Sequence, residues 1–148
     1  MTVFYLVQHG EKKQQPGDPG LTELGRQQAG RTAQWLRQAG LSAVFSSPAR
    51  RARETADLIS SAAGVAVRED IRLRERMNWD GTQPIGEFLA EWASTVRDRS
   101  LVPLAGDSSW QAGERVPCLP ARQGSGARAD RGVHPWRRHL GPAADAAR

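Results

Sequence analysis

A histidine and a cluster of arginines each follow a short apolar run of the chain. His9 comes just after the apolar run 3–7, and Arg51 lies in an arginine-rich segment, 46–56, that follows a second run, 43–45. An imidazole can act as a nucleophile, and guanidinium groups bind anions. Ligands bind where the carboxyl ends of parallel strands meet, so these side chains predict a site for an anionic substrate.

Apolar runs and helical periodicity alternate along the chain, which indicates an α/β fold. We expect strands at 3–7, 43–46 and 65–68, helices at about 22–39, 48–63 and 85–98, and a further helix opened by residues 106–109. Thr22 is expected to cap the first helix and Asp107, Ser108 or Ser109 the last. The third helix carries apolar residues at helical spacing, and we expect them in the core: Ile85, Phe88, Leu89, Trp92 and Val96.

Size and composition predict one globular domain. The chain has 148 residues, of which 39% are hydrophobic and 25% charged, as in ordinary globular domains. The single Cys118 excludes a disulfide framework, and the three histidines lack a metal-ligand spacing, so we expect neither metal nor cofactor. No basic leader precedes the first strand and no apolar stretch is long enough to span a bilayer, so we expect a cytoplasmic protein without a membrane partner.

The net charge of +5 lies mostly in the last part of the chain. Residues 116–148 contain six Arg and two Asp, whereas residues 1–115 are nearly neutral. A nucleic-acid surface would also carry aromatic side chains among its basic ones, and residues 116–148 offer only Trp136. We therefore expect no nucleic-acid partner.

Four motifs, in order, resemble those of the histidine phosphatase superfamily, the phosphoglycerate mutase-like group. Gln8-His9-Gly10 is similar to the family's Arg-His-Gly, and segment 46–56 to its Ser-Ser-Pro-x-x-Arg-Ala-x-x-Thr-Ala. Residues 21–29 resemble its Leu-Thr-x-x-Gly-x-x-Gln-Ala stretch, and residues 73–76 its acid-bearing loop. The resemblance covers residues 1–115 and implies a three-layer sandwich, with a mostly parallel central sheet and helices on both faces.

The resemblance also implies a role for each motif residue. His9 would be the nucleophile that is transiently phosphorylated, Glu75 the general acid, and Arg51 a bidentate phosphate ligand. Further phosphate or substrate contacts would be Gln8, Gly10 and Arg76. From the residues alone, His9 could instead bond nearby backbone, and Glu75 could form a salt bridge with a flanking arginine.

The chain departs from the family's pattern in two places. Gln8 replaces the usual arginine, which removes a cationic phosphate ligand unless Lys12 or Lys13 reaches the phosphate. The family's second histidine, in a His-Gly turn after an apolar strand, has no counterpart, because residues 116–148 contain four Pro and no strand-length apolar run. We therefore expect residues 1–115 to form an incomplete domain without its last strand and helix, followed by a basic tail rich in Pro, Arg and Ala.

A shifted reading frame would explain this tail. Read from the second base of each codon, the codons permitted for residues 134–145 can encode Thr-His-Gly-Gly-Val-Thr-Ser-Asp-Leu-Leu-Arg-Thr, which contains the missing motif. Under this hypothesis the frame changes near residue 115. The alternative is a genuine, disordered basic tail.

We expect a phosphomonoesterase that hydrolyses a small phosphorylated metabolite through a phosphohistidine, impaired if one wall of its pocket is missing. The alternatives are a phosphoglycerate mutase-type phosphotransferase and an inactive phosphate-binding relative. Specificity is expected to lie between Arg76 and Asp107, where Trp79 and Trp92 would line a pocket or fill the core. The sequence leaves the substrate and the oligomeric state open.

Overall fold

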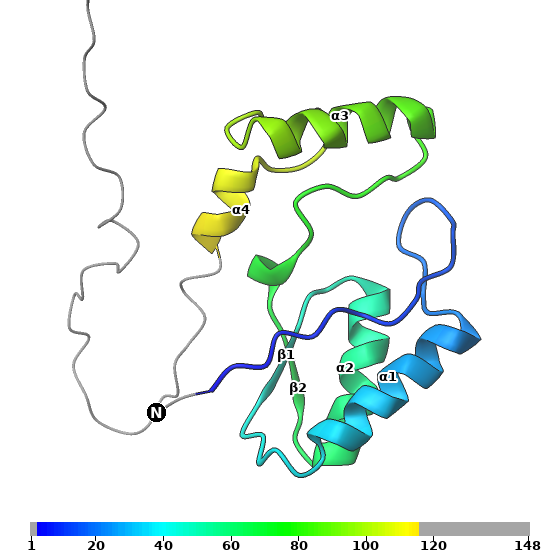
Figure 1. Cartoon of the computed structure of the whole chain (residues 1–148), viewed down its shortest axis with the longest axis vertical. Coiled ribbons are helices and arrows are strands. Elements are labelled where there is room, and N and C mark those ends of the chain that lie inside the picture. Colours follow the sequence, from blue (N-terminus) through cyan, green and yellow to red (C-terminus); the bar gives the residue numbers. More distant parts are fainter. Residues whose placement is uncertain (1–2, 116–148) are drawn as a thin grey trace, which may run out of the picture.

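The computed structural model describes residues 3–115, and our predictions for the tail, its reading frame and the second histidine lie outside them. Apart from the strand expected at 3–7, the elements follow the predicted order (Figure 1). They are α1 (Glu23–Leu36), β1 (Val44–Ser46), α2 (Arg50–Ala63), β2 (Val67–Glu69), the short 3-10 helix η1 (Ile71–Leu73), α3 (Ile85–Arg97) and α4 (Ser109–Arg115).

The core lies where α1 and α2 pack against each other and on β1 (Figure 1). Strand β1 is parallel to β2, with Val44 opposite Val67 and Ser46 opposite Glu69. The buried core residues are small or branched: Ala33, Leu36, Val44, Ala56 and Ile59. Burying these side chains supplies most of the apolar stabilisation of this part of the chain. The α/β class and the parallel sheet are thus confirmed.

Both core helices have identifiable ends. The Thr22 hydroxyl accepts a hydrogen bond from the Gly25 amide at 2.9 Å, which caps α1 as predicted. Gly64 ends α2 in the left-handed conformation, at φ 70°, where a residue without Cβ is favoured. These ends fix where the loops toward the site leave the helices.

The predicted strand at 3–7 is not formed. This segment is extended, makes no ladder with β1 or β2, and leaves the Leu6 side chain 94% exposed. A strand needs a neighbour that pairs with its backbone groups, and here Tyr5 makes only an edge-to-face ring contact with Trp35, at 5.7 Å. Among residues 3–115 the sheet has two strands, so the wide central layer of the expected sandwich is not present in this part.

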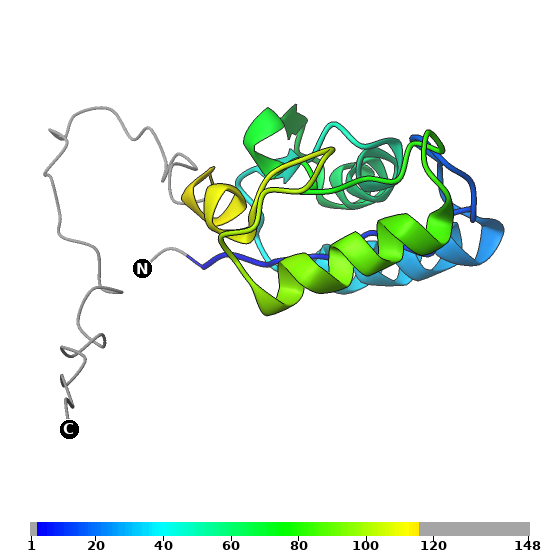
Figure 2. The same cartoon turned by 90° about the horizontal axis from the view of Figure 1, so that it is seen from above.

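Helices α3 and α4 lie next to each other, away from the α1–α2 pair (Figures 1 and 2). Ser108 caps α4, because its hydroxyl accepts from the Gln111 amide at 3.1 Å while its own amide donates to Gln111 Oε1 at 2.8 Å. The expected core position of the α3 side chains is wrong for Ile85, Leu89, Trp92 and Val96, which are 46–53% exposed. No described element covers this face of α3.

Candidate active site

The loop that carries His9 is held closely against both core helices. The Gly10 amide donates to Thr55 Oγ1 of α2 at 3.2 Å. On the other side, a Cβ at Gly10 would collide with the backbone oxygen of Gly25 in α1. Only glycine fits this approach, which explains the Gly that follows His9 and fixes the imidazole beside the first turn of α2.

The hydrogen bonds of His9 leave one ring nitrogen ready to act as a nucleophile. Its Nδ1 lies 2.7 Å from the Gly10 carbonyl oxygen, which can only accept, so Nδ1 carries the proton. Nε2 keeps its lone pair and accepts a hydrogen bond from Arg51 Nε at 3.2 Å. The backbone bond that we considered as an alternative role for His9 therefore selects the tautomer that leaves Nε2 unprotonated.

Arg51 is the centre of the cluster. Its side chain is 2% exposed, although it is charged. The guanidinium donates to His9, pairs with the Glu75 carboxylate, and lies 3.6 Å from Asp18 Oδ1. A buried arginine is tolerated only when acceptors surround it, and here these acceptors bring His9 and Glu75 to one guanidinium.

Asp18 also occupies the amino-terminal end of α2. Its two carboxylate oxygens accept from the Arg50 amide at 2.9 and 3.0 Å. The N-cap residue, Ala49, has no side chain that could cap the helix. A carboxylate is favoured at this end because the free amides carry partial positive charge. The loop 8–20 is thereby joined to the helix that presents Arg51.

Glu54 joins the same loop to α1 and α2. Its carboxylate accepts from the Leu21 amide at 3.0 Å, from Arg50 Nε at 2.8 Å and from Arg26 Nη1 at 3.0 Å. Burial by itself would raise the pKa of Glu54, but the hydrogen bonds from Leu21 and Arg50 and the charge of Arg26 outweigh it and lower the pKa. Glu54 is thus a positioning carboxylate that stays ionised.

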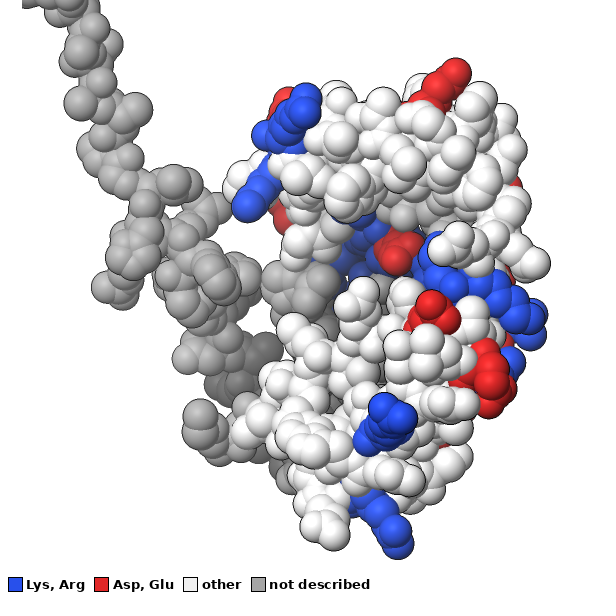
Figure 3. All heavy atoms as spheres, turned by 45° about the vertical axis from the view of Figure 1, so that its right-hand side comes forward, with Lys and Arg blue, Asp and Glu red and all other residues white. Residues whose placement is uncertain are grey.

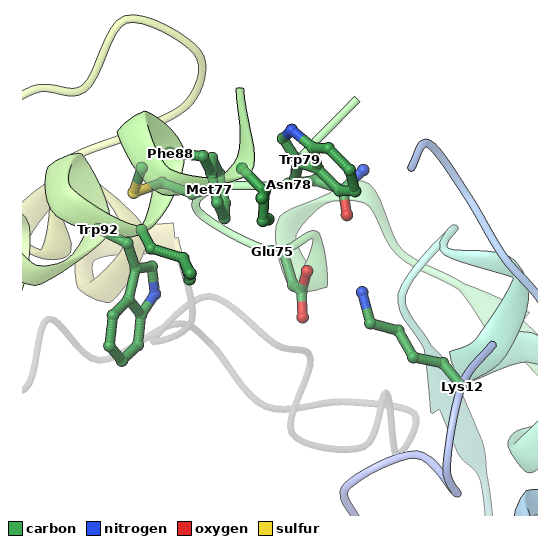
Figure 4. A pocket seen from close by; sticks show the side chains of 9 residues that line it. Lys12, Glu75, Met77, Asn78, Trp79, Phe88 and Trp92 are labelled. Atoms are coloured by element: carbon green, nitrogen blue, oxygen red, sulfur yellow. The ribbon is translucent and has the colours of Figure 1, made fainter. Parts of the chain in front are cut away.

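Glu75 follows η1 and lies at the edge of a pocket. Its side chain is 49% exposed, and its partner is Arg51 rather than a flanking arginine. The neighbouring Arg74 binds Asp107 instead, at 2.8 Å. Figure 4 shows the Glu75 carboxylate between the Lys12 ammonium and a group of apolar side chains. This carboxylate can therefore reach both the guanidinium cluster and the pocket.

Two of the predicted residues lie apart from the cluster. Gln8 is exposed and makes no side-chain hydrogen bond within the part of the chain that the structure describes. The Arg76 guanidinium lies against α3, where it donates to Thr95 Oγ1 at 2.5 Å and lies 5.9 Å from the ring centroid of Trp92. The structure thus brings together His9, Gly10, Arg51 and Glu75.

Sequence reasoning missed Asp18 and the role of Thr55. We assigned no role to Asp18, and the signal for it is an acidic residue between the histidine and the arginine-rich segment. Thr55 is 4% exposed, and we gave it no role of its own within the motif 46–56. Its hydroxyl bonds both the Gly10 amide and the Arg51 carbonyl, at 3.2 and 2.9 Å.

The pocket beside Glu75 has a volume of about 380 Å³. Figure 3 shows charged side chains gathered in a hollow, below an almost uncharged face formed by α3. The lining residues are Lys12, Glu75, Met77, Asn78, Trp79, Ile85, Phe88, Leu89 and Trp92.

Within residues 3–115 no cluster of His, Cys, Asp and Glu has the composition of a metal site. In the same range, no helix combines the length and apolar character needed to cross a bilayer.

Several proteins of known family are similar to this chain. A probable phosphoglycerate mutase GpmB of Erwinia tasmaniensis is 42% identical over 130 residues, covering 66% of this chain and 60% of that protein. The probable phosphoglycerate mutase GpmB of Yersinia pestis is 39% identical over 82 residues, covering 51% of this chain and 38% of that protein. The chain thus spans at most about 60% of these relatives.

Solved structures share the fold. The mycobacterial glucosyl-3-phosphoglycerate phosphatase Rv2419c aligns with a TM-score of 0.63 at 30% identity, covering 73% of this chain and 57% of its own. Bacillus stearothermophilus YhfR aligns with a TM-score of 0.59 at 27% identity, covering 73% and 60%. The family model of the histidine phosphatase superfamily (branch 1) matches residues 4–129. With its motifs in family order and their residues gathered around Arg51, this chain belongs to the histidine phosphatase superfamily.

Proposed function

We propose that this protein is a phosphomonoesterase that hydrolyses a small phosphorylated metabolite through a phosphohistidine on His9. The observation that carries the proposal is the buried Arg51, whose guanidinium bonds both His9 Nε2 and Glu75. A dianionic phosphate placed at this guanidinium would have a nucleophile and an acid within reach. The structure of the mycobacterial phosphatase with inorganic phosphate, 31% identical with a TM-score of 0.60, supports a phosphate ligand in such a fold.

In the first step Arg51 exchanges its bonds to His9 and Glu75 for bonds to the phosphate oxygens. His9 Nε2 then attacks phosphorus in line with the ester oxygen, while Nδ1 stays bonded to the Gly10 carbonyl. Released from Arg51, the Glu75 carboxylate takes a proton from solvent; the bond between phosphorus and the ester oxygen then breaks, and the leaving alcohol takes that proton. The charge on the three equatorial oxygens is balanced by Arg51.

In the second step water attacks the phosphorus of phosphohistidine. Glu75, now ionised, takes a proton from that water, and His9 leaves with its lone pair restored on Nε2. Inorganic phosphate departs, Glu75 returns its proton to solvent, and Arg51 resumes its bonds to His9 and the Glu75 carboxylate. We assign no metal or cofactor to these steps, because each proton and electron pair is accounted for by His9, Glu75 and water.

Gln8 distinguishes this site from the family's pattern. The amide is neutral and would add at most a weak hydrogen bond where the family has an arginine, so phosphate binding rests mainly on Arg51. Lys12 is the cation best placed to compensate, since it lines the pocket beside Glu75. We propose that residues 1–115 carry the phosphatase-like domain, and that the protein works in the cytoplasm without a nucleic-acid or membrane partner.

The names of the curated relatives favour a second candidate, transfer of the phosphoryl group between positions of phosphoglycerate. The discriminating experiment incubates the full chain with a panel of phosphate monoesters that includes 3-phosphoglycerate. A phosphatase releases inorganic phosphate, whereas a mutase returns an isomeric ester. His9→Ala must abolish either activity. If phosphate binds but neither product forms, the chain is the third alternative, an inactive phosphate-binding relative.

A further inference from the structure

We propose that the preferred substrate is a phosphate monoester of an apolar alcohol, whose carbon skeleton occupies the pocket beside Glu75. This inference deepens the proposed function and rests on it. It concerns the half of the substrate that the phosphate-binding cluster does not touch.

The lining of the pocket is apolar and aromatic. Six of its nine lining residues are Met77, Trp79, Ile85, Phe88, Leu89 and Trp92. They come from the segment before α3 and from the face of α3 that no described element covers, with Leu89 53% and Trp92 47% exposed. A bound apolar group would remove part of this surface from water, which is the main source of affinity for such a ligand.

Two hydrogen-bond donors of the pocket wall, on Asn78 and Trp79, are already bonded within the protein. Asn78 Nδ2 donates to the Gly17 carbonyl oxygen at 2.7 Å, and Trp79 Nε1 donates to the Gln83 carbonyl oxygen at 2.9 Å. A sugar or other polyhydroxylated alcohol would lose its bonds to water here and find few replacements. The wall therefore favours carbon over hydroxyl groups.

The position of Glu75 connects this pocket to the reacting phosphate. Glu75 pairs with Arg51 on one side and lines the pocket on the other (Figure 4). An acid that protonates the leaving oxygen must contact that oxygen, so the carbon attached to it points away from Arg51 into the pocket. Lys12, whose ammonium has no ion-pair partner among residues 3–115, lies across Glu75 from the apolar side chains of the same pocket.

The test measures binding, so that it does not depend on turnover. Calorimetry with the full chain compares benzylphosphonate with methylphosphonate, which share the anionic group and differ by one aromatic ring. We expect benzylphosphonate to bind roughly 10- to 100-fold more tightly, as burial of a ring implies. Equal affinities, or no binding of either compound, would overturn the inference.

Two substitutions in α3 test whether the benzyl ring binds in the pocket. Leu89→Ser removes a lining side chain, whereas Val96→Ser changes a side chain of equal exposure, 53%, that does not line the pocket. The ratio of the affinities for benzylphosphonate and methylphosphonate should fall by at least threefold in Leu89→Ser and stay unchanged in Val96→Ser. An equal fall in both variants, or no fall in either, would contradict the placement, and circular dichroism verifies that both variants keep their helices.

Phosphate release from benzyl phosphate, with His9→Ala as the control, tests the proposed function separately. Glycerol phosphate is the comparison ester, because both are primary alkyl esters with leaving groups of similar basicity. If the phosphonates bind as expected but neither ester is hydrolysed, the proposed function fails while the pocket assignment stands. If both esters are hydrolysed and the phosphonates bind equally, the pocket assignment fails alone.

Discussion

Replacing Arg51 by lysine keeps the positive charge and removes the planar fork, so it tests the geometry of the cluster. Arg51 donates to His9 and Glu75 from different nitrogens while its side chain is 2% exposed. A lysine ammonium has a single nitrogen and cannot meet both partners and a phosphate in the same way. Losing one charge-assisted hydrogen bond to phosphate costs about 1.5–3 kcal/mol, which corresponds to a roughly 10- to 150-fold weaker affinity.

The matched control is Arg53→Lys, two residues along the same helix. Arg53 pairs with Glu69 at the surface, where the two side chains are 52% and 44% exposed. Such exposed pairs contribute little, about 1 kcal/mol at most, and this one lies outside the cluster. Phosphate affinity in Arg53→Lys should therefore equal that of the unmodified chain.

The assay is calorimetric titration of each variant with inorganic phosphate at constant ionic strength, together with the rate of phosphate release from a monoester. Thermal unfolding followed by circular dichroism verifies that both variants are folded. If Arg51→Lys is folded and binds phosphate within threefold of the unmodified chain, the planar fork of Arg51 is not what binds phosphate, and the predicted geometry is wrong. The predicted geometry is equally wrong if Arg53→Lys loses as much affinity as Arg51→Lys.

The remaining predictions concern the supports of the site. Gly10→Ala should lower the free energy of unfolding by about 1–3 kcal/mol and abolish phosphate release, because the new Cβ collides with Gly25. Gly30→Ala, which places its Cβ in open space on the same helix as Gly25, should raise the free energy of unfolding by about 0.5–1 kcal/mol. Equal melting temperatures for the two variants would contradict this prediction. The side-chain hydrogen bond from Arg72 holds the pKa of Asp70 below its ordinary 3.8, at about 2. The ionised Asp70 carboxylate therefore contributes its full stabilisation above pH 3.8, and this contribution is lost as the pH falls through 2. Chemical denaturation should find Asp70→Asn less stable than the unmodified chain at neutral pH, and the two should become equally stable in acid. A difference in stability that does not change with pH would show that the charge of Asp70 is not its cause.

The sequence predicts well the parts of the fold that local patterns determine. The α1 cap at Thr22, helices α1 to α4 and the two strands of the parallel sheet all occur close to the expected positions. Each depends on contacts within a few residues, or on the packing of one apolar face against the next element. A helix that satisfies its own backbone hydrogen bonds can be recognised without its neighbours.

The segment 3–7 could not be predicted in this way. Its β-branched and aromatic residues have high strand propensity, but a strand exists only with a partner that supplies the ladder. The same holds for the apolar side of α3, where helical spacing correctly identified the face but could not show whether another element covers it. Leu6, at 94% exposure, and Leu89, at 53%, are apolar residues whose burial depends on distant parts of a fold.

The motifs predicted in part which residues of the candidate site lie together, but not which contacts they make. His9, Gly10, Arg51 and Glu75 come together as the resemblance implied, whereas Arg76 packs on α3 and Gln8 stays apart. The partner of Glu75 was not predictable from neighbouring residues, because Arg51 is distant in sequence and is brought near only by the fold. The contributions of Asp18 and Thr55 belong to the same class of long-range contacts.

Trapping the covalent intermediate shows whether His9 carries the phosphoryl group. The full chain is mixed with a labelled phosphate monoester, quenched in alkali, and digested for mass spectrometry. We expect a phosphoryl group that is stable in alkali and labile in acid on the peptide containing His9, and its loss in His9→Ala. Phosphate release that persists in His9→Ala, or a label on another residue, would show that His9 is not the nucleophile.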